Sequence, residues 1–218
     1  MTLCIEQLTV GPLDVNCYII ADEITKDALC IDPGGDVDDI IEVIKNNDLK
    51  LKYIVNTHGH FDHIGGNEML KQKTGARLAI HKDDAALLKD AIEQAAFFGI
   101  KSKNSPEPDI LLKHGDALKL GNMDVKIIHT PGHTKGGICL FIPAPAGCKQ
   151  GNDTLFTGDT LFADSVGRSD LPGGSFGELI SSIKDKLMAF SNDVKVYPGH
   201  GPATTIGEER ENNSFLRD

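Results

Sequence analysis

Three histidines and an aspartate lie within six residues of the chain, at His58, His60, Asp62 and His63. Neutral imidazole nitrogens and carboxylate oxygens are ligands that suit zinc, iron and manganese. His58 and His60 are two residues apart, so in an extended segment both side chains point to the same side and can bind one ion. Asp62 and His63 follow where the chain turns, so they can bind a second ion nearby. The spacing therefore predicts a metal centre.

The alternative interpretation of this motif is a polar turn in which Asp62 caps the next helix. Four titratable groups packed together without a counter-charge would cost stability, which argues against that alternative. The β-branched and aromatic run 51–55 predicts a strand before the motif, and 67–73 predicts a helix that ends at Gly75. The motif is thus expected in a strand-to-helix turn, where functional sites commonly lie.

Three further residues of the same types each follow a predicted strand, in a turn that contains glycine: His133, Asp159 and His200. Seven ligands exceed the four that one tetrahedral ion needs, but they suffice for two ions that share a carboxylate. The remaining histidines lack neighbouring residues of ligand type, so we expect them to be structural. They are His81, His114 and His129.

The hydrophobic pattern predicts an α+β protein. Predicted strands are 4–9, 17–21, 28–31, 51–57, 76–81, 110–112, 117–120, 123–129, 137–142, 154–159 and 194–197, and predicted helices are 37–46, 67–73, 83–98, 175–190 and 206–215. We expect no alternating βαβ run, and hence two mainly β sheets packed face to face with helices outside, a four-layer αββα sandwich. Two halves, 1–110 and 111–218, are treated as one domain of residues 1–218 because ligands come from both.

The motif His58-x-His60-x-Asp62-His63 resembles that of the metallo-β-lactamase-fold hydrolases, within their glyoxalase II-like (hydroxyacylglutathione hydrolase-like) group. Segments 158–162, 167–174 and 197–209 are similar to the short branch of that group, and the resemblance covers nearly the whole chain. It implies two divalent ions, zinc first, with iron or manganese as alternatives. In that ligand set metal 1 is held by His58, His60 and His133, metal 2 by Asp62, His63 and His200, and Asp159 bridges them.

The resemblance also implies hydrolysis. Two ions about 3.5–4 Å apart make a metal-bridging hydroxide available at neutral pH, and this can attack a carbonyl carbon. Asp62 and Asp159 are the expected catalytic residues, with Asp62 accepting or relaying a proton. A thiolate is a good leaving group, so the expected substrate is a small thioester such as S-lactoylglutathione. Arg168 is expected either to bind a substrate carboxylate or to form a structural ion pair.

Other functions remain open at this point. Longer members of the group bind glutathione with a C-terminal helical domain, which is not expected here because 18 residues follow His200. A related branch, the persulfide dioxygenases, holds one iron with residues that would be His58, His133 and Asp159, and segment 167–170 resembles that branch too. A lactonase and a catalytically silent metal-binding module are further alternatives.

Composition restricts the class of partner and the compartment. The chain has 218 residues and a net charge of −10 without a basic run, which argues against nucleic acid as a partner. Its N-terminus has neither a basic region nor a long apolar segment, so we expect no signal peptide, no membrane contact and a cytoplasmic protein rather than a secreted β-lactamase. The five cysteines are widely spaced, as expected for core thiols in a reducing compartment. The oligomeric state is not indicated.

Overall fold

The structure is a computed structural model that describes residues 3–144 and 152–217. It contains two compact units, one of Met1–Leu112 with Lys119–Met123 and one of Lys113–Leu118 with Asp124–Asp218. This division lies close to the predicted division into halves, while the single domain of residues 1–218 stays a prediction. The four cysteines in the described part are free thiols, and the fifth, Cys148, lies outside it.

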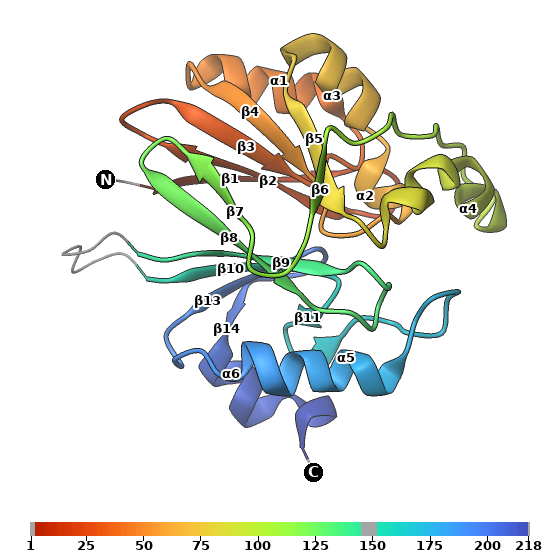
Figure 1. Cartoon of the computed structure of the whole chain (residues 1–218), viewed down its shortest axis with the longest axis vertical. Coiled ribbons are helices and arrows are strands. Elements are labelled where there is room, and N and C mark those ends of the chain that lie inside the picture. The colour runs from red at the N-terminus through yellow and green to blue at the C-terminus, as the bar shows by residue number, and fades with distance from the viewer. Residues whose placement is uncertain (1–2, 145–151, 218) are drawn as a thin grey trace. The chain divides into compact units, whose positions relative to one another are not determined.

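The first unit is built on a six-stranded sheet in the order β1-β2-β3-β4-β5-β6 (Figure 1). Its strands are β1 Leu3–Val10, β2 Val15–Asp22, β3 Asp27–Ile31, β4 Lys50–Val55, β5 Arg77–His81 and β6 Ile110–Leu112. Its helical elements are α1 Val37–Asn46, α2 Phe61–Ile64, α3 Asn67–Thr74, the 3₁₀ turn η1 Ala85–Lys89 and α4 Ala91–Phe97. Figure 1 shows α1 and α3 side by side over the sheet, where they contribute Ile40, Ile44 and Leu70 to the core.

Strand β1 pairs with β2, and β2 with β3, in antiparallel register, but β3, β4, β5 and β6 are parallel. Parallel neighbours need a crossover connection, and here α1 and α3 supply the first two. The prediction that the chain contains no βαβ alternation is therefore wrong for residues 27–81. The parallel arrangement matters for the site, because the carboxyl ends of parallel strands lie at one edge of a sheet.

The second unit is built on a sheet in the order β14-β13-β10-β9-β8-β7. Its strands are β7 Ala117–Leu120, β8 Met123–His129, β9 Ile138–Ile142, β10 Thr154–Gly158, β13 Lys195–Pro198 and β14 Thr204–Thr205, with a separate hairpin of β11 Leu161–Phe162 and β12 Ser165–Val166. Helices α5 Phe176–Ser182 and α6 Ile206–Asn212 lie on one side of this sheet (Figure 1). Leu179, Ile183 and Leu187 pack in one cluster with sheet residues such as Leu155 and Val196.

The α+β class is confirmed, since each unit combines a sheet with helices. Several predicted elements differ in length. The helix predicted at 83–98 is divided at Asp90 into η1 and α4, and the helix predicted at 175–190 is α5 followed by a π-helical turn, Ile183–Leu187. The last long helix ends at Asn212 and is followed by the 3₁₀ turn η3, Ser214–Leu216. The short elements α2, β11, β12 and β14 escaped prediction because two to four residues are too few to show a period.

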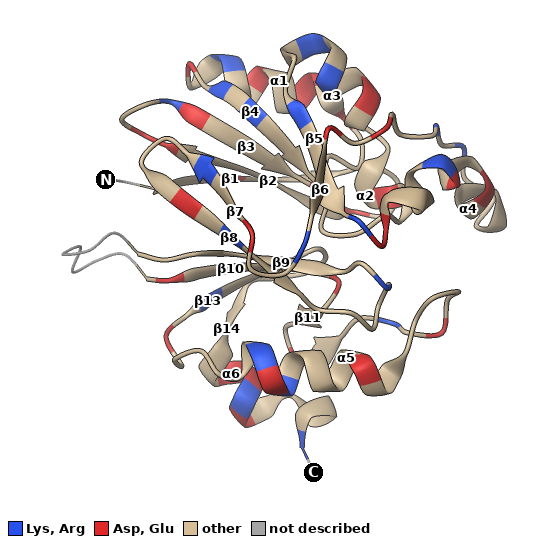
Figure 2. Cartoon of the chain, viewed as in Figure 1, with Lys and Arg blue, Asp and Glu red and all other residues tan. Residues whose placement is uncertain are grey.

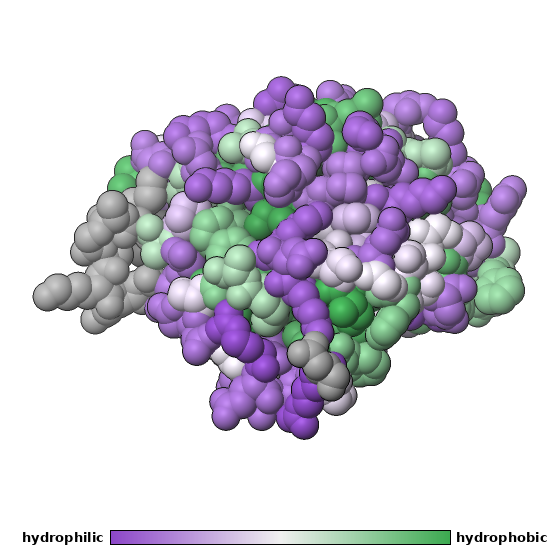
Figure 3. Space-filling view, turned by 60° about the horizontal axis from the view of Figure 1, so that its bottom comes forward, coloured by the Kyte–Doolittle hydropathy of each residue, from purple (hydrophilic) through white to green (hydrophobic). Residues whose placement is uncertain are grey.

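The outer surfaces are polar. Acidic and basic residues are interspersed on the helices and strand ends in Figure 2, and hydrophilic residues cover most of the face drawn in Figure 3. Among the described residues, no helix combines the length and the apolar character that a membrane span requires.

A buried carboxylate at the end of β2 fixes the turn 119–123 within the first unit. Asp22 is inaccessible to solvent, and its side chain accepts hydrogen bonds from the amides of Ile24 at 2.9 Å and Asn122 at 2.8 Å. The side-chain amide of Asn122 donates a further bond at 3.0 Å. Burial alone would raise the pKa of Asp22, but these hydrogen bonds outweigh it and lower the pKa.

Replacing Asp22 with alanine should therefore destabilise the protein by about 1–3 kcal/mol at pH 7, because the hydrogen bonds from Ile24 and Asn122 to a carboxylate are lost. The lowered pKa means that the ionised carboxylate stabilises the fold above its ordinary pKa of about 4 and that this contribution is lost as pH falls through the folded-state pKa. The difference between variant and wild type should thus shrink in acid. Urea unfolding measured from pH 7 to pH 3 tests this, with exposed Glu42→Ala as control. A difference that grows in acid would contradict it.

Candidate metal centre

The histidine-rich motif follows β4. His58 and His60 lie in the turn before α2, and Asp62 and His63 lie inside α2. His58 and His63 are buried, Asp62 is 8% exposed, and His60 is half-buried at the start of α2. The ring of His58 lies 4.7 Å from that of His60 and 4.1 Å from that of His63, measured between centroids. Asp62 Oδ2 lies 3.6 Å from His63 Nε2. The first unit therefore brings together all four ligand-type residues of the motif.

Asp32 and Thr57 determine which nitrogen of two of these histidines faces the centre. The Asp32 carboxylate accepts hydrogen bonds from the Thr57 amide at 2.7 Å and from the Thr57 hydroxyl at 2.6 Å, and it lies 3.0 Å from His63 Nδ1. Because the Thr57 hydroxyl donates its hydrogen to Asp32, it accepts from His58 Nδ1 at 3.1 Å. Both rings thus carry hydrogen on Nδ1, and Nε2 is the nitrogen that can bind a metal.

The backbone of this motif is held by close packing. Asp32 adopts a left-handed conformation, with φ of 50°, and a Cβ atom at Gly34 would overlap the carbonyl oxygen of Asp62. The amide of Gly59 donates to the buried carboxylate of Asp84 at 3.0 Å. Sequence analysis did not identify Thr57 or Asp84 as part of the site. Thr57 adjoins the motif, but nothing in the sequence points to Asp84, which is 25 residues from its partner.

The second unit groups the other three predicted ligands. Strands β10 and β13 are parallel, Gly158 pairs with Pro198, and the Gly199 amide donates to the Gly158 carbonyl at 2.9 Å. The residues that follow these strand ends are therefore neighbours. Asp159 Oδ2 lies 3.7 Å from His200 Nε2 and 3.6 Å from His133 Nε2.

His133 is oriented by a backbone atom. Its Nδ1 donates to the carbonyl oxygen of Arg168 at 2.7 Å, which again leaves Nε2 on the side of Asp159. The preceding Gly132 has a φ of +136° and lies so close to Leu179 that a Cβ atom would overlap it. A Cβ atom at Gly167 would overlap the carbonyl oxygen of Asp159. Glycine is thus required at position 132, before His133, and at position 167, against Asp159.

The side chain of Arg168 forms an ion pair. Its Nε and Nη2 atoms each donate to the Asp170 carboxylate at 2.8 Å, and both side chains are more than half exposed. These hydrogen bonds lower the pKa of Asp170 to about 2 and raise the pKa of Arg168. Of the two roles expected for Arg168, the ion pair is present, and binding of a substrate carboxylate stays a prediction.

The structural role expected for the other three histidines stays a prediction, although each of them takes part in a hydrogen bond. His81 Nδ1 accepts from the Asp83 amide at 3.3 Å. His129 Nε2 lies 2.8 Å from the Lys135 carbonyl, and the His129 amide donates to His114 Nδ1 at 3.3 Å. None of these contacts involves a residue of the metal motif.

Comparison with known proteins decides the family. Residues 10–200 match the model of the metallo-beta-lactamase superfamily. The chain belongs to this superfamily. It is 38% identical to the hydroxyacylglutathione hydrolase GloC of Haemophilus influenzae, over 97% of each protein. By family the chain is a metallohydrolase, and its fold is the metallo-beta-lactamase fold.

Solved structures of the superfamily agree with this. The BLEG-1 B3 metallo-beta-lactamase is 33% identical, with a TM-score of 0.89 over 99% of this chain and 100% of the other. TTHA1623 in a di-iron-bound form is also 33% identical, with a TM-score of 0.84 over 97% and 100%. The second structure shows that a member of the superfamily with this degree of similarity can bind iron.

The donors on each unit fit a divalent metal ion. Two atoms that each lie about 2.1 Å from one ion at roughly the tetrahedral angle are about 3.4 Å apart. The separations of 3.6 Å between Asp62 and His63, 3.6 Å between His133 and Asp159 and 3.7 Å between His200 and Asp159 are near that value. They are also too long for hydrogen bonds. Imidazole nitrogens and carboxylate oxygens are moreover donors that suit zinc and iron.

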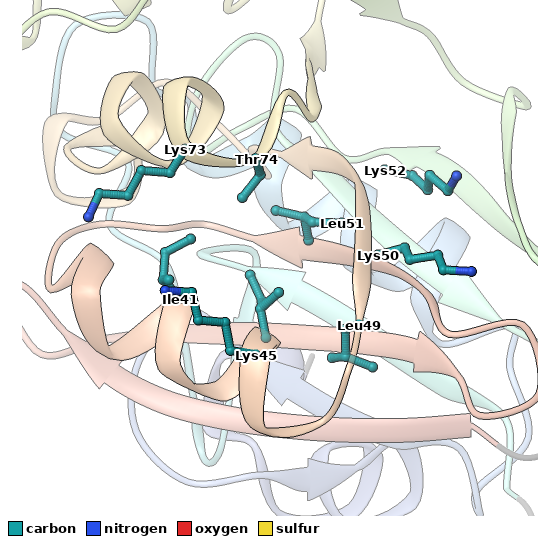
Figure 4. A pocket seen from close by; sticks show the side chains of 9 residues that line it. Ile41, Lys45, Leu49, Lys50, Leu51, Lys52, Lys73 and Thr74 are labelled. Atoms are coloured by element: carbon teal, nitrogen blue, oxygen red, sulfur yellow. The ribbon is translucent and has the colours of Figure 1, made fainter.

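A pocket of about 620 Å³ lies elsewhere in the first unit, at the amino end of β4 (Figure 4). Both apolar side chains and lysines line it. In Figure 4 the side chains of Lys50 and Lys52 point away from that of Leu51. The metal motif follows the carboxyl end of the same strand. None of the predicted ligands lines this pocket.

Replacing Asp32 with asparagine should weaken metal binding about 10- to 100-fold, because His63 and Thr57 lose the acceptor that orients them. Asparagine keeps the size of the side chain and tolerates the left-handed backbone at this position. Competition with a chelator at fixed pH measures the affinity, and thermal unfolding of the metal-free proteins separates this effect from loss of the fold. Exposed Asp38→Asn is the matched control. Unchanged affinity would show that Asp32 does not orient a ligand.

Proposed function

We propose that the chain is a binuclear metal-dependent thioester hydrolase that acts on small substrates of the S-lactoylglutathione type. Zinc is the first choice of metal, with iron or manganese as alternatives. In this proposal metal 1 is bound by His58, His60 and His133, metal 2 by Asp62, His63 and His200, and Asp159 bridges. The observation that carries it is that each unit groups its share of these donors at ligand-to-ligand spacing. The relative named as a hydroxyacylglutathione hydrolase supports the substrate class.

Bound divalent ions supply an activated water and polarise a substrate carbonyl. The residues of the chain orient the metal ligands and accept a proton. The Asp32 carboxylate and the Thr57 hydroxyl keep hydrogen on the Nδ1 atoms of His58 and His63, so that Nε2 is the donor atom of each ring. Asp62 has a carboxylate that is 10% exposed, and in this proposal it accepts the proton that the attacking water loses.

Asp159 is suited to the bridging position. One of its oxygens, Oδ2, lies within 3.7 Å of the Nε2 atoms of two histidines that we assign to different ions. A carboxylate oxygen has more than one lone pair and can be shared by two cations, which an imidazole with a single available nitrogen cannot do. The thiolate that leaves from a thioester needs no protonation before departure, so the site requires no strong general acid.

Alanine at His58 or Asp159 should abolish both metal content and thioester hydrolysis, because each removes a ligand of metal 1. The first measurement is elemental analysis of the purified wild type beside an S-lactoylglutathione hydrolysis assay. We expect about two metals per chain. Full activity in either variant would contradict the proposal, and absence of turnover on thioesters, esters and lactones by metal-loaded protein would favour a silent metal-binding module.

The variant His200→Ala separates the binuclear hydrolase from a mononuclear iron persulfide dioxygenase. In the hydrolase His200 binds metal 2, so its loss should lower the metal content to about one per chain and reduce hydrolysis at least about 100-fold. In the dioxygenase only His58, His133 and Asp159 hold iron, and the iron content should be unchanged. Oxygen uptake with a persulfide measures the second activity directly. One iron per wild-type chain with such uptake would replace our proposal.

Arg168→Ala should leave metal content unchanged, because the chain binds His133 through the carbonyl oxygen of residue 168, which every residue has. If the guanidinium also binds a substrate carboxylate, KM rises while kcat is retained. Asp170→Asn is the matched variant, since it removes the ion pair but keeps the arginine. Loss of metal from Arg168→Ala would show that the ion pair, rather than the backbone, positions His133.

A further inference from the structure

Helix α4 ends in two aromatic side chains that are open to solvent. Phe97 is 83% exposed and Phe98 is 42% exposed, and their rings meet edge to face with centroids 5.4 Å apart. Exposed apolar side chains that lie side by side can mark a binding surface. Figure 3 shows hydrophobic residues at its right-hand edge, the side on which Figure 1 draws α4.

One side chain of α4, that of Gln94, forms hydrogen bonds with the metal motif. Gln94 accepts a hydrogen bond from the Phe61 amide at 3.1 Å and donates to the Gly59 carbonyl at 3.4 Å. These two peptide groups lie on either side of His60. A Cβ atom at Gly59 would overlap Leu87 of η1, so the helical segment before α4 also packs directly on the motif. The position of α4 is therefore set by the loop that presents His60.

Apolar contact continues from the aromatic pair to Asp62. The Phe98 ring packs on the Phe61 ring with centroids 5.6 Å apart, and Phe61 is buried. Phe61 also lines a pocket of about 580 Å³ together with Asp62, Met69 and Ile100. The size of this pocket is in the range that suits a small ligand. Ring contacts thus lead from Phe97 through Phe98 to Phe61, which lines this pocket together with Asp62.

We propose that Phe97 and Phe98 form a specificity surface that binds an apolar substituent of the acyl group. This rests on the proposed function, since it assumes that an acyl group is held at the metal motif. The occupant is a small molecule, because Phe98 contacts Phe61 and Phe61 lines a pocket of about 580 Å³ beside Asp62. Aromatic faces contribute through contact area, so the preference is for larger, less polar acyl groups.

The test compares two thioesters that differ only in this substituent, S-lactoylglutathione with a methyl group and S-mandeloylglutathione with a phenyl group. Replacing both Phe97 and Phe98 with alanine should lower kcat/KM for the mandeloyl substrate about 10-fold or more, and for the lactoyl substrate less than about 3-fold. Metal content and thermal unfolding should match wild type, because both side chains are at the surface. Phe215→Ala, at an exposed aromatic far along the chain, is the control.

A binding measurement complements the kinetics. Calorimetric titration with S-hexylglutathione and S-methylglutathione gives the affinity gained from the longer alkyl group, which the double variant should lose. The molar mass of wild type and variant in solution is measured in parallel. A fall in mass in the variant would show that the aromatic pair is instead a contact between copies of the chain, and would overturn the proposal.

The outcomes separate the two proposals. Wild type that cleaves neither thioester overturns the proposed function, and this inference with it. Wild type that cleaves both, combined with a double variant that keeps the mandeloyl-to-lactoyl ratio of kcat/KM, overturns only the role of the aromatic pair. A ratio that falls about 10-fold while metal content is unchanged supports both.

Discussion

The buried carboxylate of Asp32 is the interaction on which the metal motif depends. It binds the amide and the hydroxyl of Thr57 and lies against His63, and through Thr57 it also determines the protonation of His58. An imidazole can bind a metal only through a nitrogen without hydrogen, so a residue that never touches the ion decides how two ligands face it. The left-handed backbone of Asp32 is retained for this contact.

The rest of the fold places the carboxyl ends of strands close together, so that the residues that follow them are neighbours. In the first unit the motif follows β4, the second strand of a parallel group, and in the second unit Asp159 and His200 follow the parallel pair β10 and β13. Parallel pairing aligns carboxyl ends, so short turns after each strand bring ligands together without long loops. Glycines then allow the backbone to approach closely, as Gly34 does at Asp62 and Gly167 at Asp159.

Side chains that act by chemical type could be predicted from the sequence. Each unit brings its own ligand-type residues close together, while the two metal ligand sets stay a prediction. Atoms whose role depends only on where the fold places them could not be predicted from the sequence. The carbonyl of Arg168 orients His133, but a carbonyl is common to every residue and leaves no trace in the sequence. Asp84 and Gln94 reach the motif from distant segments, and their positions depend on how η1 and α4 divide at Asp90. The division at Asp90 could not be predicted, because the apolar residues of 83–98 keep helical spacing on both sides of it.

The attachment of α4 by Gln94 has a kinetic consequence. One amide holds the peptide groups on both sides of His60, so α4 cannot swing outward without loosening the loop that carries this histidine. An outward movement of α4 would then also loosen the loop of His60, which is a predicted metal ligand. The same motion of α4 would then limit the rate at which the metal ion dissociates and the rate at which a molecule bound against the helix dissociates. A molecule that holds α4 in place would therefore slow the loss of metal.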